Sequence, residues 1–467
     1  MSLLNIGTTA LLTTQNALAT TSHNISNVNT EGYSRQRTEQ VTHLPNFEGT
    51  HYIGSGVTVG SVERIYDTFL AEQVRRYTSQ ESQFDTFYEF ASQIDDILGS
   101  TELGLDSGLE SFFAAAQEVA NDPTSIPARQ VLLTEAGLLA NRFNTLDGQL
   151  QQFDDQIDSQ ITVSIGDINS LSRGIAELNQ AIIEAEGTGA TPNDLLDKRD
   201  NLINQLSEYV SVDIIPESSG AVSVFVGSGQ ALVVGTTQID LFAIPDGGLP
   251  PRITVGYGPA QIDISTQLTG GTIGGIFQVR TDVLDASRTA LDDLASSFVT
   301  AINNLHNDAL NPAGAIDLNG NAGGDLFDPA GLTASTINIL ITDPRLIAAS
   351  SGTSPGVGNN ENILVLADLQ TDPTTVVVSA APLITQSFSD TIGVLIAEVA
   401  TRTHQADIGR QTQQGLRLQA ESKFDSVSGV NLDEEAANLI RLQQAYQAAS
   451  QIIVTSNTIF NALINAV

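Results

Sequence analysis

Apolar residues recur every seven positions along residues 439–467. The first set consists of Leu439, Tyr446, Ile453, Phe460 and Val467. A second set, three positions further on, consists of Leu442, Ala449, Ser456 and Leu463. This spacing of seven and three is that of the a and d positions of a coiled coil, so it predicts a C-terminal helix with one apolar packing face.

The N-terminal segment has the same spacing. Its heptad positions are Leu4, Leu11, Leu18 and Ile25. No Asp, Glu, Lys or Arg occurs in residues 1–30 or 442–467, so both helices forgo the charge pairs that support exposed helices. Because the N-terminal segment is also rich in threonine, a poor helix former, we expect both ends to be largely unfolded until they pack against neighbours. The alternative is a simple antiparallel hairpin that closes a monomer.

Between the two ends the period of the pattern changes. Residues 60–210 read as long amphipathic helices. From 211 to about 271, β-branched runs such as "AVSVFVG" and "ALVVG" alternate with Gly, Ser and Pro clusters, which predicts an antiparallel β module. Helical sequence returns at 274–310. A Gly-, Pro- and Asn-rich region with a few strand-like runs follows at about 311–385, and the rest of the chain reads as helix.

These elements are nested, with the terminal helices outermost along the chain and the β-rich inserts in its middle. The sequence therefore predicts a mainly α, elongated multidomain protein whose heptad helices form a terminal coiled-coil domain. The predicted domains are 1–35 with 430–467 as that terminal domain, 36–310 with 386–429 as a helix-rich core that includes the β segment at about 211–271, and 311–385 as a small outer domain or insert.

The charge of the chain excludes several classes of partner. Its 467 residues carry 54 acidic and 19 basic side chains, a formal net charge of -35, which repels nucleic acid and anionic lipid surfaces. The longest apolar runs are too short to span a bilayer. The chain contains no cysteine, and its first basic residue is Arg35. A Sec-type signal peptide is therefore not expected, and the protein either stays inside the cell or leaves it by another route.

Motifs for catalysis and for metal binding are incomplete. "GTSPG" at 352–356 fits the nucleophile-elbow pattern around Ser354, but Pro355 lacks the N–H that such an oxyanion hole needs. "DLNGNAGGDLFD" places Asp317, Asn319, Asn321 and Asp328 at positions of a calcium loop, yet Ala322 stands where the turn requires Gly. We therefore favour an Asx turn, with calcium as the alternative. The five histidines, expected to be ordinary surface or half-buried side chains, are His23, His43, His51, His306 and His404. We expect no enzymatic activity, no cofactor and no metal.

The stretch "SHNISNVNTEGYSRQ" at 22–36 follows the first heptad helix. Taken locally it is a helix end, where amide side chains satisfy backbone groups and Gly32 can turn the chain in a left-handed conformation. It also resembles the N-terminal signature of the bacterial flagellar axial proteins, the rod, hook and hook-associated proteins, although Ser22, His23 and Ser26 depart from that signature. The matching positions are Asn24, Asn27, Asn29, Thr30, Gly32 and Tyr33. We interpret the stretch as a hinge between the assembling ends and the domains they carry.

The C-terminal stretches "SGVNLDEE" and "QQAYQAASQ" are more specific. Together with "NDPTSIPARQVLLTEAGLLANRF", "LNGNAGGDLF" and "GNNENILVLADLQ", they resemble the hook-associated protein 1 family, the hook–filament junction proteins, over the length of the chain and most weakly at 211–271. The resemblance implies a structural subunit of the flagellum without catalytic activity. The implied partners are other copies of the chain in a ring-like layer, the hook protein, the second junction protein and an export chaperone at the C-terminal helix, with export unfolded through the flagellar type III channel to the cell exterior.

Within that resemblance the terminal helices would form the inner tube of the assembly. We call their predicted contact positions the assembly seam: Leu4, Leu11, Leu18, Ile25, Leu439, Leu442, Tyr446, Ile453, Phe460 and Leu463. Asn431 is predicted to cap the C-terminal helix, with Glu434 completing a capping box. Two other readings stay open at this point, namely another axial component, such as a hook or distal rod protein, and a secreted adhesin or hydrolase carried on flagellar ends.

Overall fold

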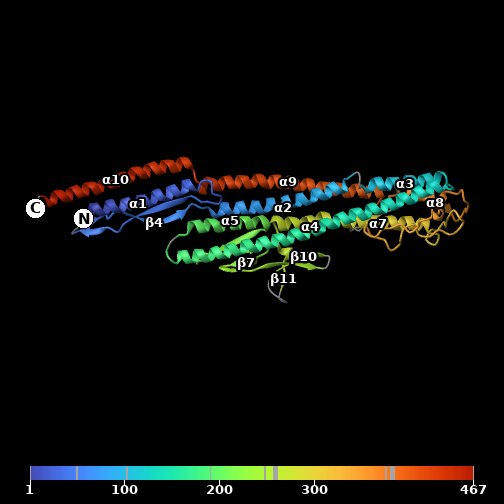
Figure 1. Cartoon of the computed structure of the whole chain (residues 1–467), viewed down its shortest axis with the longest axis horizontal. Helices are drawn as coiled ribbons and strands as arrows, with labels where there is room; N and C mark the ends of the chain where they lie inside the picture. Colours follow the sequence, from blue (N-terminus) through green and yellow to red (C-terminus); the bar gives the residue numbers. More distant parts are fainter. Residues whose placement is uncertain are drawn as a thin grey trace. The chain divides into compact units, whose positions relative to one another are not determined.

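The computed structural model describes residues 2–48, 51–100, 104–189, 191–246, 249–255, 261–373, 376–378 and 384–465 (Figure 1). The chain forms two compact units. The terminal unit consists of Met1–Ser82, Val163–Ile273 and Gln411–Val467, and the central unit of Gln83–Thr162 and Gly274–Arg410. Three long helices contribute residues to both units: α2 (Thr68–Leu98), α4 (Ile126–Glu186) and α9 (Phe388–Ser428).

In the terminal unit the first and last helices of the chain lie side by side. These are α1 (Ser2–Ser26) and α10 (Leu432–Ile464), which run antiparallel along the upper left of Figure 1. Helix α1 also contacts β1 (Gln36–Thr42) and β4 (Val57–Arg64), which pair as an antiparallel hairpin. Between them, β2 (Asn46–Glu48) pairs with β3 (His51–Ile53). The expectation of two adjacent heptad helices at the ends of the chain is confirmed.

The β1–β4 hairpin was not predicted, and the assignment of residues 60–64 to helix is wrong because they belong to β4. Strand β1, "QRTEQVT", has polar side chains on both of its faces. It therefore lacks the alternation of apolar and polar residues by which a half-buried strand is recognised.

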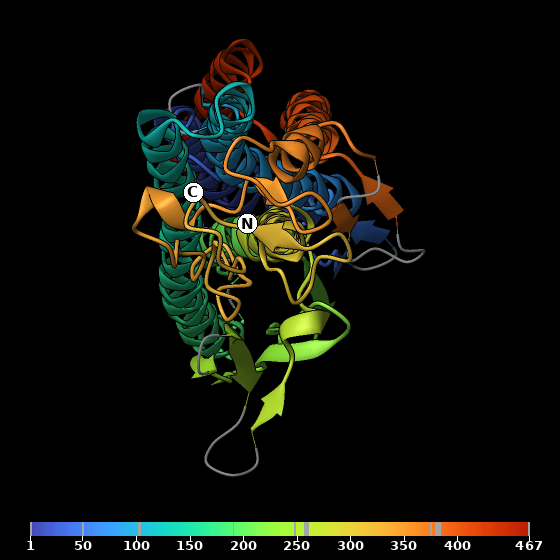
Figure 2. The ribbon, with the colours of Figure 1, turned by 90° about the vertical axis from the view of Figure 1, so that its right-hand side faces the viewer.

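The β module at 211–271 is confirmed as antiparallel. Strands β5 (Val212–Pro216), β6 (Val222–Val226), β7 (Gln230–Val234) and β8 (Thr237–Gln238) form one sheet in sequence order. Strands β9 (Leu241–Asp246), β10 (Leu249–Val255) and β11 (Ile262–Asp263) form a second sheet, followed by the 3-10 turn Ser265–Gln267. Figure 2 shows these strands in green below α4. Two asparagines of α4 hold the module: Asn179 binds Val222 and Gly235, and Asn169 binds Leu241.

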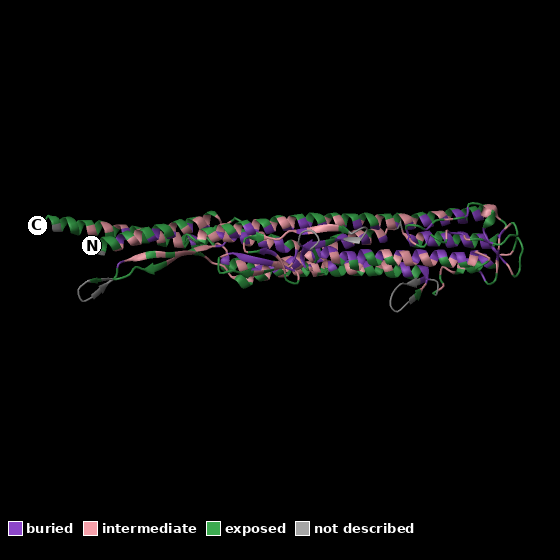
Figure 3. Cartoon of the chain, turned by 90° about the horizontal axis from the view of Figure 1, so that it is seen from below, coloured by how far each residue is buried: buried purple, intermediate pink, exposed green. Residues whose placement is uncertain are grey.

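The central unit is a helical core with short strands. Its elements are α3 (Leu105–Asn121), most of α6 (Gly271–Val279), a π-helical turn at Arg280–Leu284, α7 (Asp285–His306), α8 (Glu361–Asp368), a 3-10 turn at Pro344–Leu346 and two strand pairs, β12 (Ala315–Ile316) with β13 (Ser350–Ser351) and β14 (Val376–Val378) with β15 (Ile384–Gln386). Buried residues, purple in Figure 3, line the helices of this unit. Helix α8 lies in the Gly-, Pro- and Asn-rich region where a few strand-like runs were expected, so this helix was not predicted.

His306 corrects the expectation that every histidine is a surface or half-buried side chain. It is fully buried at the end of α7. Its Nε2 accepts a hydrogen bond from the Ala348 N–H at 2.9 Å, so Nδ1 carries the proton and donates to the Gly324 carbonyl at 2.6 Å. Burial lowers the pKa of His306, which keeps the ring neutral. The ring thus joins the backbone of Gly324 and of Ala348 to α7.

Candidate assembly site on the terminal helices

Helices α1 and α10 approach each other through small residues. The buried residues of α1 are Gly7, Thr13, Thr14, Ala17, Thr21 and Asn24. At Gly7 a Cβ atom would lie 2.8 Å from Cγ1 of Ile453, so only glycine fits there without a shift of the facing side chain. On α10, Ala449 is buried. A contact built from such residues removes little apolar surface from water, so it contributes little to the free energy of folding.

The larger apolar residues of the assembly seam keep much of their surface exposed. Half-buried positions are Leu11, Leu18, Ile25, Leu439, Leu442 and Ile453. Leu4 is 43%, Tyr446 37% and Phe460 61% exposed, while the side chain of Leu463 lies outside the described residues. In Figure 3 exposed residues, in green, cover most of α10. Along residues 2–26 of α1 and 442–464 of α10 the isolated pair therefore presents partly apolar helix faces without Asp, Glu, Lys or Arg to its surroundings.

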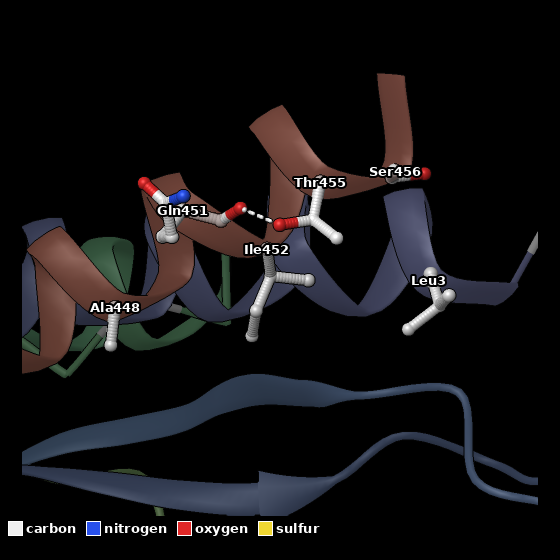
Figure 4. Close-up of a pocket in the computed structure, with 6 residues that line it drawn as sticks. All are labelled: Leu3, Ala448, Gln451, Ile452, Thr455 and Ser456. Atoms are coloured by element: carbon white, nitrogen blue, oxygen red, sulfur yellow. Dashed lines mark hydrogen bonds between the residues drawn. The ribbon is translucent and has the colours of Figure 1, made fainter. Parts of the chain in front are cut away.

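A shallow groove of about 320 Å³ lies between the start of α1 and the second half of α10 (Figure 4). Its lining residues are Leu3, Ala448, Gln451, Ile452, Thr455 and Ser456. The Thr455 hydroxyl donates to the Gln451 carbonyl at 2.9 Å, so its hydrogen-bonding capacity is used within the helix. The lining contains no titratable side chain, which suits the groove to packing of uncharged side chains.

The signature residue Asn24 joins the end of α1 to the start of the hairpin. Its side-chain amide pairs with the backbone of Gln36 in both directions: Nδ2 donates to the Gln36 carbonyl and Oδ1 accepts from the Gln36 N–H, both at 2.9 Å. Tyr33 Oη donates to the same Oδ1 at 2.7 Å. Burial, assisted by the carboxylate of Asp194, raises the pKa of Tyr33, so the phenol remains a donor. The Asn24 side-chain amide thus pairs with Gln36 as a backbone amide of a neighbouring β-strand would.

The other signature residues shape the turn after α1. Asn27 Nδ2 donates to the His23 carbonyl at 3.0 Å, and the Thr30 hydroxyl donates to Asn27 Oδ1 at 3.1 Å. Gly32 has φ +73°, the left-handed conformation that was predicted. Asn29 is exposed. These short-range bonds account for the amide-rich composition of the turn without any ligand.

The start of α10 is tied to the same segment. Asn431 caps the helix, because its Oδ1 accepts from the N–H of Asp433 at 2.9 Å and of Glu434 at 3.3 Å. The Glu434 carboxylate pairs with Arg35 at 2.5 Å in place of the predicted return to Asn431. Glu435, which is buried, accepts from Asn24 Nδ2 at 3.2 Å. Residues 24–36 thus hold the start of α10 as well as the end of α1, a link that sequence spacing does not reveal.

The motifs considered for chemistry occupy turns. Ser354 is exposed, and its N–H donates to the Ser351 carbonyl at 3.3 Å. Asp317 Oδ1 accepts from the N–H groups of Asn319 and Asn321, both at 2.8 Å, which is the favoured Asx turn. In the described part of the chain no group of three or more His, Asp or Glu side chains is placed to bind a metal ion. No described helix is long and apolar enough to cross a membrane.

Three protein-family models match different parts of the chain. Residues 91–327 match the flagellar hook-associated protein FlgK helical domain, residues 421–466 the flagellar basal body rod FlgEFG protein C-terminal model, and residues 4–33 the flagella basal body rod protein model. The chain is 30% identical to flagellar hook-associated protein 1 of Escherichia coli K12, with 99% of each protein covered. The chain belongs to the flagellar hook-associated protein 1 family.

Other relatives are similar over comparable lengths. Flagellar hook-associated protein 1 of Bacillus subtilis 168 is 28% identical, with 98% of this chain and 96% of that protein covered. The flagellar hook junction protein FlgK from Burkholderia pseudomallei has a similar fold, with a TM-score of 0.67 at 18% identity over 76% of this chain and 100% of the solved chain. The family is one of structural proteins of the flagellar hook–filament junction, and the role of the chain is structural in the flagellum. This confirms the resemblance on which the expected function rested.

Proposed function

We propose that the chain is a subunit of the layer between hook and filament and that it assembles through α1 and α10. The observation that carries the proposal is the state of the assembly seam. The two helices have no charged residue in 1–30 or 442–467, they touch through small residues, and Phe460 remains 61% exposed. In a tightly packed wall of several subunits an unpaired charge would be costly, whereas uncharged helix faces can be covered by neighbouring copies.

The partners proposed for such a subunit are those that its family resemblance implies. Neighbouring copies would complete the packing of α1 and α10 in a ring-like layer, with the hook protein on one side and the second junction protein on the other. A long uncharged amphipathic helix also suits helix-in-groove binding by an export chaperone. Export through the flagellar type III channel to the cell exterior requires an unfolded chain, with which a cysteine-free sequence is compatible. No catalytic activity belongs to this role.

A matched pair of substitutions tests the role of the assembly seam. Phe460 and Ile262 are equally exposed, at 61% and 59%, but Ile262 lies in the β module. We expect a deletion strain to have hooks, no filaments and flagellin in the medium when examined by electron microscopy. Phe460→Asp and Ile453→Asp should leave the central unit folded but fail to restore filaments, and Ile262→Asp should restore them.

Two outcomes would contradict the proposal. Normal filaments on cells that carry Phe460→Asp would exclude the terminal helices as the assembling surface. A deletion strain without hooks would indicate a hook or distal rod component, because those parts are needed before the junction layer.

A further inference from the structure

The N-terminal half of α5 (Asn193–Tyr209) turns a polar face toward the segments that flank the hairpin. Asp194 Oδ1 accepts from Gln36 Nε2 at 2.8 Å. Asn193 Nδ2 donates to the carbonyl of Val62, near the end of β4, at 2.8 Å. One helix face therefore binds both strands of the hairpin. We call this face, defined by Asn193, Asp194, Asp197, Asp200 and Asn201, the α5 lock face.

The centre of the α5 lock face is a buried ion-pair cluster. Arg64, the last residue of β4, donates to Asp197 Oδ1 at 3.0 Å and to Asp200 Oδ2 at 2.6 Å. The second oxygen of Asp197 accepts from the backbone N–H of Ser34 at 3.0 Å. The Arg64 guanidinium also lies 4.1 Å from the centre of the Tyr66 ring. Asp197 thus links the chain just before β1 to the last residue of β4.

These groups are shielded from solvent. The side chains of Arg64, Asp197 and Asp200 are only 14%, 8% and 15% exposed. Burial raises the pKa of Asp197, and the hydrogen bonds from Ser34 and Arg64 oppose that rise. Removing one partner would leave a buried charge uncompensated, which is strongly unfavourable. The cluster is therefore stable when all of its ion pairs are formed, and breaking one of them is strongly unfavourable.

Glycine allows the signature turn to reach the same face. Gly32 lies against Asn201, to whose Cβ an added side-chain carbon would be only 3.3 Å away. Its left-handed φ of +73° is also unfavourable for other residues. The end of α1 is bonded to Gln36 through Asn24, and the start of α10 is bonded to Asn24 through Glu435. A continuous set of bonds therefore runs from α5 to both terminal helices.

From these contacts we infer that the α5 lock face fixes the terminal helix pair to the rest of its unit, so that the signature segment is a rigid joint in place of the hinge expected from its sequence. Arg64, Asp197 and Asp200 are positioning residues. They set the direction of α1 and α10 relative to the rest of the terminal unit. The inference rests on the proposed function, because a fixed direction matters only if these helices assemble. A rigid joint would pass force from the packed helices directly to α5.

Hydrogen exchange of the purified full-length protein measures the opening of this joint. We expect the amides of residues 33–38 and 62–66 to exchange slowly and at similar rates in the parent. Asp197→Asn and Arg64→Gln should each raise both rates by about 10- to 100-fold, because each leaves a buried group without its partner. The amides of β5–β8 should keep their parental rates. The exposed carboxylate of Asp213 in β5 provides the control, and Asp213→Asn should change neither segment.

The double variant Arg64→Gln with Asp197→Asn separates the joint from a general loss of folding. With both charges removed, the amides of residues 33–38 should exchange more slowly than in Arg64→Gln alone. A general loss of folding would instead make them exchange faster in the double variant than in either single variant. Rapid exchange of residues 33–38 in the parent, or unchanged rates in Asp197→Asn, would overturn the inference. Neither result depends on whether cells that carry Phe460→Asp form filaments. The joint and the proposed function can therefore be refuted separately.

Discussion

The centre of the central unit and the pair of terminal helices differ in how they are held together. In the central unit Phe112, Phe298 and Phe327 meet edge to face or at a tilt, with the ring of Phe298 5.2 Å from each of the other two. Phe388, the first residue of α9, lies 5.6 Å from Phe298. All four side chains are fully buried. The centre of this unit encloses a cluster of large aromatic rings, whereas α1 and α10 bury small residues and leave their large apolar groups partly exposed.

The difference supports the proposal that folding and assembly depend on different regions of the chain. Burial of an aromatic ring stabilises a monomer by a few kcal/mol, and that stabilisation is already complete inside the central unit. In the terminal pair the larger apolar side chains are still partly exposed, and we propose that neighbouring subunits cover them. Changes of the fully buried rings should therefore alter the free energy of unfolding, whereas changes of exposed apolar side chains of α10, such as Phe460, should alter assembly.

The largest effect is expected for Phe298→Ala. The substitution removes a fully buried ring that contacts residues of α3 and α9, so it should lower the free energy of unfolding by about 3–5 kcal/mol. Phe460→Ala removes the same type of side chain from α10 and should change the free energy of unfolding by less than about 0.5 kcal/mol. Urea unfolding followed by circular dichroism measures both. A similar loss for the two variants would refute the distinction between the regions.

A pH-dependent effect of intermediate size is expected in the central unit. Its buried His306 is neutral, and its pKa is lowered from the usual 6.5. Below pH 6.5 the unfolded chain therefore binds a proton that the folded chain does not. The free energy of unfolding should fall by up to about 1.4 kcal/mol per pH unit as the pH drops below that value, and this histidine should contribute no slope above it.

His306→Asn isolates the contribution of this histidine. The variant should be less stable than the parent at pH 7.5, because the bonds to Gly324 and Ala348 are lost or weakened. Between pH 5 and 6.5 its stability should depend less on pH than that of the parent. Equal slopes in thermal or urea unfolding would mean that His306 is not the titrating group.

Elements with a strong apolar period were predictable from the sequence. The long amphipathic helices, the antiparallel β module and the two heptad helices each follow from local spacing, and Asn431 caps α10 as its side-chain chemistry indicates. For these elements the side chains that determine the structure are neighbours in the sequence. Secondary structure can be predicted from the local sequence when that condition holds.

Features that depend on distant partners were not predictable. Strand β1 is polar, and the lock face that binds its start lies more than 150 residues further along the chain. His306 is buried by 323–324 and 348, which its own helix does not reveal. In α1 the leucines suggested the contact positions, but the residues that are buried are the small ones, such as Gly7 and Ala17. Whether the leucines pack in the assembled state stays a prediction, as does the division into three domains.

The smallest effect is expected at Gly7, and it tests how closely the terminal helices are packed. Alanine is favoured over glycine in a helix by about 1 kcal/mol. At Gly166 of α4, where nothing lies within 4 Å of an added Cβ, Gly166→Ala should show most of that gain in thermal unfolding. Gly7→Ala should show none, because its Cβ would meet Cγ1 of Ile453 at 2.8 Å and press α1 away from α10. Faster amide exchange in α10 of Gly7→Ala would accompany the missing gain. If Gly7→Ala instead matched Gly166→Ala, the two terminal helices would be unpaired in the free protein, as their threonine content suggests, and close contact would form only on assembly.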